Sequence, residues 1–246
     1  MHERTVLSMR MKMNADLVPK GSAVADIGCD HGYVSIYLAT VKKCRRVIAM
    51  DVNAGPLSIA RDHIKQTDMH KIIECRQSDG MEALQPGEAD TVLIAGMGGM
   101  LICRILQQSK NILDEVNTLV LQPQSDQMEV RCKLFELGFR IEEERFCKDA
   151  GKYYLAIRAV RGTETEPYTN AEYRYGRILL ERKDPLYNQY LLEEMNKREH
   201  LLSKLLDHPS ERAKVREMQI HRELIELKQL MAKYYKVHTF DNLSES

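Results

Sequence analysis

The sequence lacks an excess of charge of either sign, since its 36 Lys and Arg residues equal its 36 Asp and Glu residues. Only a local basic cluster can therefore bind a polyanionic partner. The longest apolar runs, such as Thr91–Cys103, contain glycines and are shorter than the roughly 18 to 20 residues of a membrane span. Met1–Lys20 carries charges throughout and has no apolar stretch before a cleavage site. We expect a cytoplasmic protein without a membrane span.

Paired cysteines are also absent. The six cysteines include no CxxC pair, and a chain of 246 residues does not need disulfides to form a stable core. We therefore expect reduced thiols. None of the eight histidines is spaced from a cysteine or from another histidine as metal ligands are, so no metal site is predicted. Repeats and low-complexity segments are missing too, and 43% hydrophobic residues exclude a disordered chain.

Short β-type runs alternate with helical segments from Ser22 to Arg158, which is typical of a parallel sheet covered by helices. The runs are Ala23–Ile27, Val47–Asp51, Ile72–Gln77, Thr91–Ala95, Thr118–Gln122, Ile141–Cys147 and Tyr153–Arg158. Helical spacing separates the first five, as in Tyr33–Thr40, Pro56–Lys65 and Met100–Gln108, and Met128–Leu137 follows the fifth. Such crossovers require parallel pairing. The short link Lys148–Lys152 predicts an antiparallel hairpin at one edge.

The composition changes after Arg158, because Arg161–Pro167 is polar with Gly and Pro and no β-type run follows. We place a domain boundary here, between residues 1–160 and 161–246. Prolines in Asp184-Pro185 and Asp207–Ser210 divide the second part into helices. Apolar residues at helical spacing are Leu191, Met195, Leu202 and Leu205, then Ile220, Leu224, Leu227, Met231 and Tyr234. This pattern predicts an antiparallel coiled-coil hairpin, the alternative being helices that pack only on the first domain.

The stretch from Val24 to Tyr33 reads as a buried strand, a glycine turn and a helix. Gly28 and Gly32 allow a ligand to approach the backbone. Asp30 stands where the dinucleotide fingerprint has its second glycine and would repel a pyrophosphate, which disfavours an NAD-dependent dehydrogenase. The carboxylate can instead bind a ligand ammonium, as in a nucleoside that carries an amino acid chain. The alternative is a plain turn with Asp30 as a cap.

Two further acids follow strands where a doubly wound fold binds ligands. Asp51 ends the second run, and its two oxygens suit the paired hydroxyls of a ribose. Asp79, followed by Gly80, comes after the third run and can accept a hydrogen bond from an adenine amino group. Together with Asp30, these acids favour S-adenosyl-L-methionine as the cofactor.

Several blocks resemble one known family. They are Asp26-Ile-Gly-Cys-Asp-His-Gly, Ala49–Pro56, Ser78-Asp-Gly, Ile94–Gly99 (Ile-Ala-Gly-Met-Gly-Gly) and Leu119–Gln124 (Leu-Val-Leu-Gln-Pro-Gln). Together they look like the bacterial tRNA (adenine-22-N1)-methyltransferases, the TrmK family, in order from Leu7 to Tyr154. The resemblance implies a class I methyltransferase with a Rossmann-like α/β sheet and a coiled-coil C-terminal domain. It implies methyl transfer from S-adenosyl-L-methionine to N1 of adenine 22 in the D-arm of tRNA.

The matching blocks also imply site residues. The predicted cofactor-binding residues are Asp26, Gly28, Asp30, Gly32, Asp51, Val52, Asp79 and Gly80. The predicted substrate-binding residues of this part are Arg10, Gly96, Met97, Gly98, Gly99, Gln122 and Pro123. Gln124 departs from the asparagine that we expect there, which leaves a substrate contact of its side chain open.

The block Ala95–Gly99 has glycines where enzymes that methylate exocyclic amines have an Asn/Asp-Pro-Pro-aromatic segment. Adenine N1 already presents an in-plane lone pair, so the site has mainly to position the base and to stabilise its developing positive charge. We predict Asp30 and His31 as catalytic residues, Asp30 for its negative field, which Asp79 can supply as well, and His31 as a proton relay. The alternative for His31 is a capping or packing role.

Local basic clusters must provide affinity for tRNA, the predicted partner. They are Arg10 with Lys12, Lys42 with Lys43, Arg45 and Arg46, Arg174 with Arg177, Arg182 with Lys183, and Arg212 with Lys214 and Arg216. Arg174 and Arg177 are predicted to share one helical face and to contact tRNA. Tyr168, Tyr173 and Tyr175 lie among them, to stack on bases or to pack.

Two rival functions stay open at this point. One is a class I methyltransferase that acts on a protein or a small molecule, which has less need of a long helical arm. The other is a non-catalytic interaction protein, which the acids at the ends of three strands disfavour. The sequence does not indicate an oligomeric state.

Overall fold

The computed structural model describes residues 7–207 and 211–235. The chain forms two compact units, Met1–Pro167 and Tyr168–Ser246. Residues 161–167, which the sequence pattern groups with the helical part, are joined to the first unit by hydrogen bonds. The guanidinium of Arg161 donates to the carbonyls of Val116 and Leu137, each at 3.0 Å, and to that of Leu113. The division at residue 160 stays a proposal about function.

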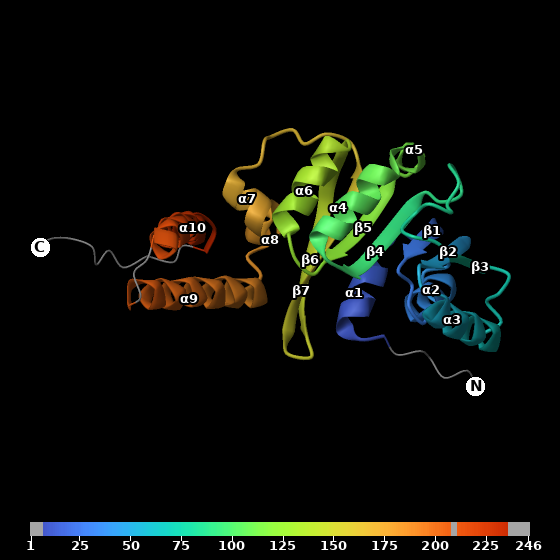
Figure 1. Cartoon of the computed structure of the whole chain (residues 1–246). Helices are drawn as coiled ribbons and strands as arrows, with labels where there is room; N and C mark the ends of the chain where they lie inside the picture. The colour runs from blue at the N-terminus through green and yellow to red at the C-terminus, as the bar shows by residue number, and fades with distance from the viewer. Residues whose placement is uncertain (1–6, 208–210, 236–246) are drawn as a thin grey trace, which may run out of the picture. The chain divides into compact units, whose positions relative to one another are not determined.

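The first unit contains one seven-stranded sheet, in the order β3-β2-β1-β4-β5-β7-β6 (Figure 1). Its strands are β1 (Ala23–Ile27), β2 (Arg46–Asp51), β3 (Ile73–Gln77), β4 (Thr91–Met97), β5 (Thr118–Pro123), β6 (Phe139–Asp149) and β7 (Lys152–Arg161). The first five pair in parallel, and β7 pairs antiparallel with both β5 and β6. The predicted Rossmann-like α/β class and the hairpin at one edge are confirmed.

Six helices accompany this sheet in the described residues. They are α1 (Met9–Leu17), α2 (Tyr33–Thr40), α3 (Ala54–Gln66), α4 (Gly99–Gln108), α5 (Lys110–Leu113) and α6 (Gln127–Glu136). The expectation of a helix between every pair of the first five strands is wrong for β3 and β4, whose connection, residues 78–90, contains only turns. Gly80 and Gly87 have positive φ there and Pro86 adds a break, so a helix cannot propagate.

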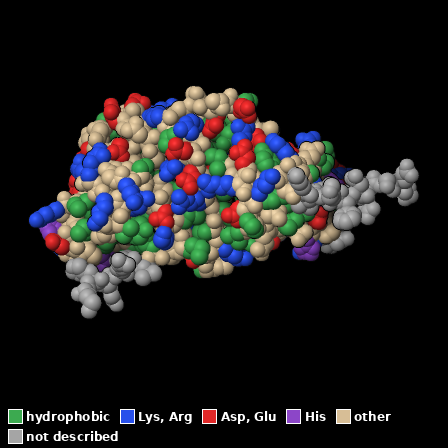
Figure 2. Space-filling model, turned by 180° about the vertical axis from the view of Figure 1, so that it is seen from behind, with side chains coloured by type: hydrophobic (Ala, Val, Ile, Leu, Met, Phe, Trp, Pro, Cys, Tyr) green, Lys and Arg blue, Asp and Glu red, His purple; other side chains and the backbone are tan. Residues whose placement is uncertain are grey.

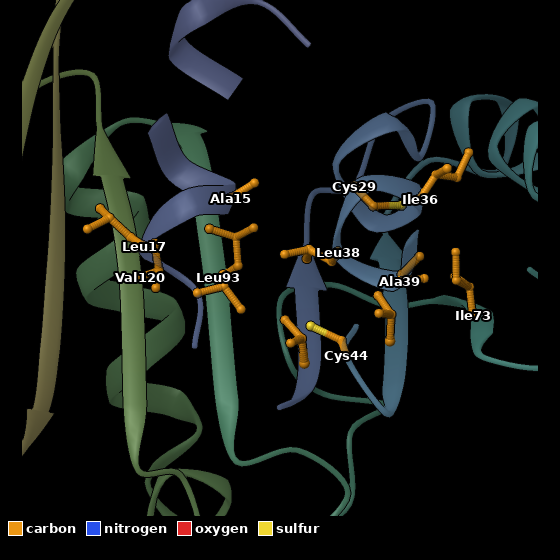
Figure 3. Close-up of a cluster of buried hydrophobic side chains, with 14 of the residues drawn as sticks. Ala15, Leu17, Cys29, Ile36, Leu38, Ala39, Cys44, Ile73, Leu93 and Val120 are labelled. Carbon is orange, nitrogen blue, oxygen red and sulfur yellow. The ribbon is translucent and has the colours of Figure 1, made fainter. Parts of the chain in front are cut away.

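The core lies where α1 and α2 cover the sheet (Figure 3). Ala15 and Leu17 of α1 lie beside Leu93 of β4 and Val120 of β5, all essentially inaccessible to solvent. β1 is buried at each of its five positions, as expected of a central parallel strand. All six cysteines are free, as predicted. In the described part of the chain, no helix combines the length and the apolar composition needed to cross a bilayer.

The second unit is helical, as predicted. It contains α7 (Asn170–Tyr175), α8 (Arg177–Arg182), α9 (Pro185–Asp207) and α10 (Glu211–Tyr235). Asp184 caps α9, because its carboxylate accepts the N–H groups of Leu186 and Tyr187 at 2.7 and 3.3 Å. The buried apolar positions of α10 include Ile220, Leu224, Leu227 and Met231. Ion pairs such as Arg198–Glu223 join α9 to α10. The coiled-coil pairing stays a prediction, and positions 208–210 of the predicted helix break lie outside the described residues.

Candidate cofactor and methyl-acceptor site

The glycine loop after β1 is fastened to the neighbouring strand. The N–H groups of Gly28 and Cys29 donate to the carbonyl of Met50 at 2.8 and 2.9 Å. Gly28 has φ +75°, and a Cβ there would lie 2.5 Å from Cε of Met97. Gly32 has φ +76° and begins α2. The loop therefore needs glycine at both positions, and its backbone at Gly28 contacts the side chain of Met97 on β4.

Asp51 connects this loop to the one after β2. Its side chain is buried, with Oδ2 accepting the N–H of Asp30 at 3.1 Å and Oδ1 accepting the N–H of Asn53 at 2.9 Å. Asp30 itself is exposed and has φ 52°. Val52, 53% exposed, follows Asp51 and presents an apolar side chain to solvent. The structure thus brings the predicted residues Asp30, Asp51 and Val52 together.

Asp26 lies inside the sheet at the end of β1, beneath the loop. It is 4% exposed, and the hydroxyl of Ser35 donates to its Oδ2 at 2.6 Å. Burial raises the pKa of Asp26 to about 6, and the nearby Asp51 adds to the rise, while the Ser35 hydrogen bond opposes it. This geometry supports the start of α2, and a direct cofactor contact of Asp26 stays a prediction.

The side chains of His31 and Asp30, the two predicted catalytic residues, lie close to each other. Its Nε2 is 3.7 Å from Oδ1 of Asp30, and its Nδ1 is buried without a hydrogen-bond partner among the described residues. Its carbonyl lies 3.0 Å from Nδ1 of His63, whose ring stacks on Tyr33 at 4.9 Å. No sequence pattern links His63 to His31, which is 32 residues away. Proton transfer by His31 stays a proposal.

Asp79 is exposed after β3, and Gly80 packs against α4, where an added Cβ would lie 3.1 Å from two carbons of Ile105. A pocket of about 370 Å³ opens beside them, between the turns that connect β3 to β4 and the helices α4 and α5. It is lined by Asp79, Gly80, Met81, Glu82, Leu84, Gln85, Pro86, Ile105, Gln108, Ser109, Asn111 and Ile112. Asp79 is thus accessible to a polar ligand.

The segment Gly96–Gly99 connects β4 to α4 in close contact with the loop after β5. The N–H of Gln124 donates to the carbonyl of Met97 at 2.9 Å, and the N–H of Gly99 donates to Oγ of Ser125 at 3.4 Å. A Cβ at Gly99 would lie 2.4 Å from the carbonyl oxygen of Ser125. Glycine is therefore required where the two loops meet.

Helix α1 adds Arg10 to the same edge of the sheet. The Arg10 side chain donates from Nη1 to Oε1 of the fully buried Gln122 at 3.3 Å, and its guanidinium lies 5.2 Å from the ring centre of Tyr154. The main-chain N–H of Arg10 donates to Asp149 at 3.0 Å. The sequence pattern named Tyr154 only as part of a matching block and missed Asp149. No local signal links Arg10 to a residue 139 positions away.

The predicted RNA-binding pair Arg174 and Arg177 belongs to the second unit. The two residues do not share one helix face, because Gly176, with φ 78°, ends α7 and Arg177 begins α8. Arg174 pairs with Glu223 at 3.5 Å, and Arg177 pairs with Glu172 at 3.0 Å. Both guanidiniums thus have internal partners, and their contact with RNA stays a prediction.

The basic cluster at residues 42–46 precedes or begins β2, whereas Asp51 ends it. Arg45 pairs with Asp90 at 2.9 Å, and Arg46 pairs with Glu74 at 2.8 Å. This cluster therefore lies at the opposite edge of the sheet from the candidate site. Figure 2 shows Lys and Arg side chains interspersed with Asp and Glu on one face, in keeping with the balanced composition.

Other chemistry finds less support in the described residues. Burial raises the pKa of the Cys29 thiol, and the carboxylates of Asp26 and Asp51 add to the rise, so this cysteine beside the loop is a poor nucleophile. No group of three or more His, Cys, Asp or Glu side chains is arranged there to hold a metal ion.

Comparison with known proteins points to one family. The family model of tRNA (adenine(22)-N(1))-methyltransferase, TrmK, matches residues 24–229. The tRNA (adenine(22)-N(1))-methyltransferase of Bacillus subtilis is 29% identical over 226 residues, which cover 89% of this chain and 95% of that protein.

Solved structures are similar over most of the chain. The crystal structure of the B. subtilis m1A22 tRNA methyltransferase TrmK is 27% identical with a TM-score of 0.85, covering 92% of this chain and 99% of that one. A Streptococcus pneumoniae protein solved in complex with S-adenosyl-L-methionine is 26% identical with a TM-score of 0.82, covering 92% and 100%.

Proposed function

This chain belongs to the TrmK family of tRNA (adenine(22)-N(1))-methyltransferases, and on this premise we propose that it transfers a methyl group from S-adenosyl-L-methionine to N1 of adenine 22 in tRNA. The observation that carries the proposal is the contact between two loops. The side chain of Met97, the last residue of β4, lies over Gly28 of the loop after β1. A cofactor bound on the first loop and a base bound on the second therefore lie side by side.

The residues present fit S-adenosyl-L-methionine. Each oxygen of Asp51 accepts one main-chain N–H and keeps a second lone pair, so the carboxylate can also accept the two ribose hydroxyls. The exposed Val52 offers an apolar surface to the adenine ring. The exposed carboxylates of Asp30 and Asp79 suit the ammonium and the adenine amino group at the two ends of the molecule.

When bound, the cofactor supplies an electrophilic methyl group on a sulfonium. The protein has to hold the adenine with N1 in line with that methyl group and to keep water away from it. The backbone of Gly96–Gly99, which carries no Cβ at three of its four positions, allows a planar base to approach closely. We propose that the negative field of Asp30 stabilises the charge that develops on the base. We propose that His31, whose Nε2 lies 3.7 Å from Oδ1 of Asp30, accepts a proton from the exocyclic amino group of the cationic methylated adenine, which leaves neutral 1-methyladenine.

The tRNA substrate requires contacts beyond one base, since a structured RNA is held through its backbone and shape. We propose that the helical second unit supplies part of them through its basic residues, among them Arg174 and Arg177. These arginines must then exchange Glu223 and Glu172 for phosphates. A tRNA-modifying activity also implies the cytoplasm as its location.

Nucleoside analysis tests the proposal. The full-length protein is incubated with labelled S-adenosyl-L-methionine and unmodified tRNA that contains adenine 22, and the RNA is then digested. We expect label in 1-methyladenosine and none when position 22 carries guanine. Label in another nucleoside, or only in added protein, would favour the rival class I methyltransferase functions.

A further inference from the structure

Arg10 is unusual among the arginines of this protein. Almost every other described arginine that is partly or fully buried has a carboxylate partner. These paired arginines are Arg46, Arg76, Arg131, Arg140, Arg145, Arg158, Arg174, Arg177 and Arg198. Arg161 instead donates to three carbonyls. Within the described residues, the guanidinium of Arg10 has one neutral partner, Gln122, and no carboxylate within ion-pair distance.

The position of this guanidinium is fixed from several sides. The helix that carries it is held by the Asp149 carboxylate, which accepts the Arg10 main-chain N–H, and by the buried residues Met13, Ala15 and Leu17. The side chain lies between Gln122 on β5 and Tyr154 on β7, and a Cβ at Gly96 would be 3.3 Å from its Nη1. The guanidinium has five N–H donors, so most of them remain available to a ligand.

A partly buried guanidinium without a carboxylate partner, next to a ligand site, is suited to bind an anionic group of the ligand. Two anions come near this edge in the proposed reaction, the carboxylate of the cofactor and the phosphates of the target nucleotide. The cofactor loop follows β1, whereas Gln122 is the second-last residue of β5, which is two strands away or about 10 Å across the sheet. Gly96, Gln122 and Tyr154 all belong to the half of the sheet on the acceptor side of β1. The placement favours the nucleotide.

We infer that Arg10, positioned by Gln122 and Tyr154, binds a phosphodiester group next to the adenine that is methylated. This inference rests on the proposed function. The bidentate geometry of a guanidinium matches two phosphate oxygens, and the charge pair is shielded from water on the side of the sheet. Holding the phosphate beside Gly96 fixes the sugar and thereby the direction from which the base reaches the Gly96–Gly99 segment.

A chemical double-mutant cycle tests the inference. Full-length wild type and Arg10→Gln are assayed on tRNA assembled with natural phosphates or with a neutral methylphosphonate on either side of adenine 22. The substitution keeps the main-chain N–H that Asp149 binds, so α1 stays attached. Arg104→Gln, on the exposed side of α4, removes the same charge elsewhere and serves as the matched control.

We expect Arg10→Gln to lower kcat/KM about 10- to 100-fold with natural tRNA, because a charge-assisted hydrogen bond is lost. One methylphosphonate should lower kcat/KM of the wild type by a similar factor and that of Arg10→Gln by less than about twofold. The dissociation constant of S-adenosyl-L-methionine, measured by calorimetry, should stay unchanged, as should the activity of Arg104→Gln.

Multiplicative losses in the cycle would overturn the inference, and a weaker cofactor affinity in Arg10→Gln would assign Arg10 to the cofactor carboxylate instead. If Arg10→Gln does not fold, Arg10→Lys replaces it in the same cycle and should keep part of the methylphosphonate effect. Failure of the proposed function is distinct, since the wild type would then not methylate natural tRNA at all.

Discussion

At the scale of single residues, two buried carboxylates under the glycine loop have opposite tasks. Asp51 accepts the N–H groups of Asp30 and Asn53, and its oxygens keep further lone pairs for a ligand. Asp26, without a comparable set of donors, is shifted toward its neutral form by burial. The two acids therefore respond differently to replacement by their amides.

Asp51→Asn should weaken the binding of S-adenosyl-L-methionine by about 1 to 3 kcal/mol, because a charged acceptor becomes a neutral amide with a single oxygen. It should also lower stability modestly, since one of the two main-chain N–H groups loses its acceptor. Calorimetric titration below the unfolding temperature measures the effect, with the exposed Asp62→Asn as control. An unchanged dissociation constant in folded Asp51→Asn would remove this residue from the cofactor site.

Asp26→Asn should change how stability depends on pH. The folded-state pKa of about 6 lies above the ordinary aspartate value of 3.8, so the folded state binds this proton more tightly than the unfolded state. The resulting stabilisation is present at low pH and is lost as pH rises through about 6, by about 1 kcal/mol between pH 5 and 7. Urea unfolding at both pH values should show that the stability of Asp26→Asn, relative to that of the wild type, rises with pH, because only the wild type loses this contribution. A difference independent of pH would contradict this assignment.

At the scale of elements, the junction between the loops after β4 and β5 depends on one missing side chain. Gly99→Ala should lower the free energy of unfolding by about 1 to 3 kcal/mol or more, because its Cβ meets the main-chain carbonyls of Ser125 and Asp126 at 2.4 and 2.7 Å. Gly55→Ala is the matched control. No atom lies within 4 Å of its Cβ in α3, and alanine favours a helix by up to about 1 kcal/mol. Equal stabilities of the two variants would refute the close contact.

The elements themselves were largely predictable, because buried parallel strands are continuous apolar runs and the helices between them have a different period. β1 and α2 match their predicted bounds. The connection from β3 to β4 was not predicted, since length alone does not distinguish a helix from a series of turns. The acids at the carboxyl ends of strands were predictable as well, because each follows an apolar run that marks its strand. The contacts of Arg10 depend on tertiary packing and have no local pattern.

At the scale of the whole molecule, the chain combines a sheet unit that carries the cofactor motifs with a helical unit in which Arg174 and Arg177 pair with glutamates. We predict that a fragment ending at Pro167, which keeps the contacts of Arg161, folds and binds S-adenosyl-L-methionine with nearly normal affinity. Its kcat/KM for tRNA should fall about 100-fold to several thousand-fold, from the loss of about 3 to 5 kcal/mol of remote binding energy.

Calorimetry and tRNA turnover of the fragment and of the full-length protein make the comparison. The fragment must end after residue 167, because a break at Val160 would remove Arg161 and confuse misfolding with lost RNA contacts. Full tRNA turnover by the folded fragment would exclude a role for the helical unit in substrate binding.

The hydrogen bond between Arg10 and Asp149 also means that α1 reaches its final position late during synthesis of the chain. Arg10 leaves the ribosome before Asp149, whose carboxylate accepts its main-chain N–H and which is made 139 residues later. Strand β7, which carries Tyr154 and pairs with both β5 and β6, emerges later still. At roughly 5 to 20 residues per second, α1 waits several seconds or longer for its final position. A nascent chain therefore has no finished acceptor site until nearly the whole sheet has been translated.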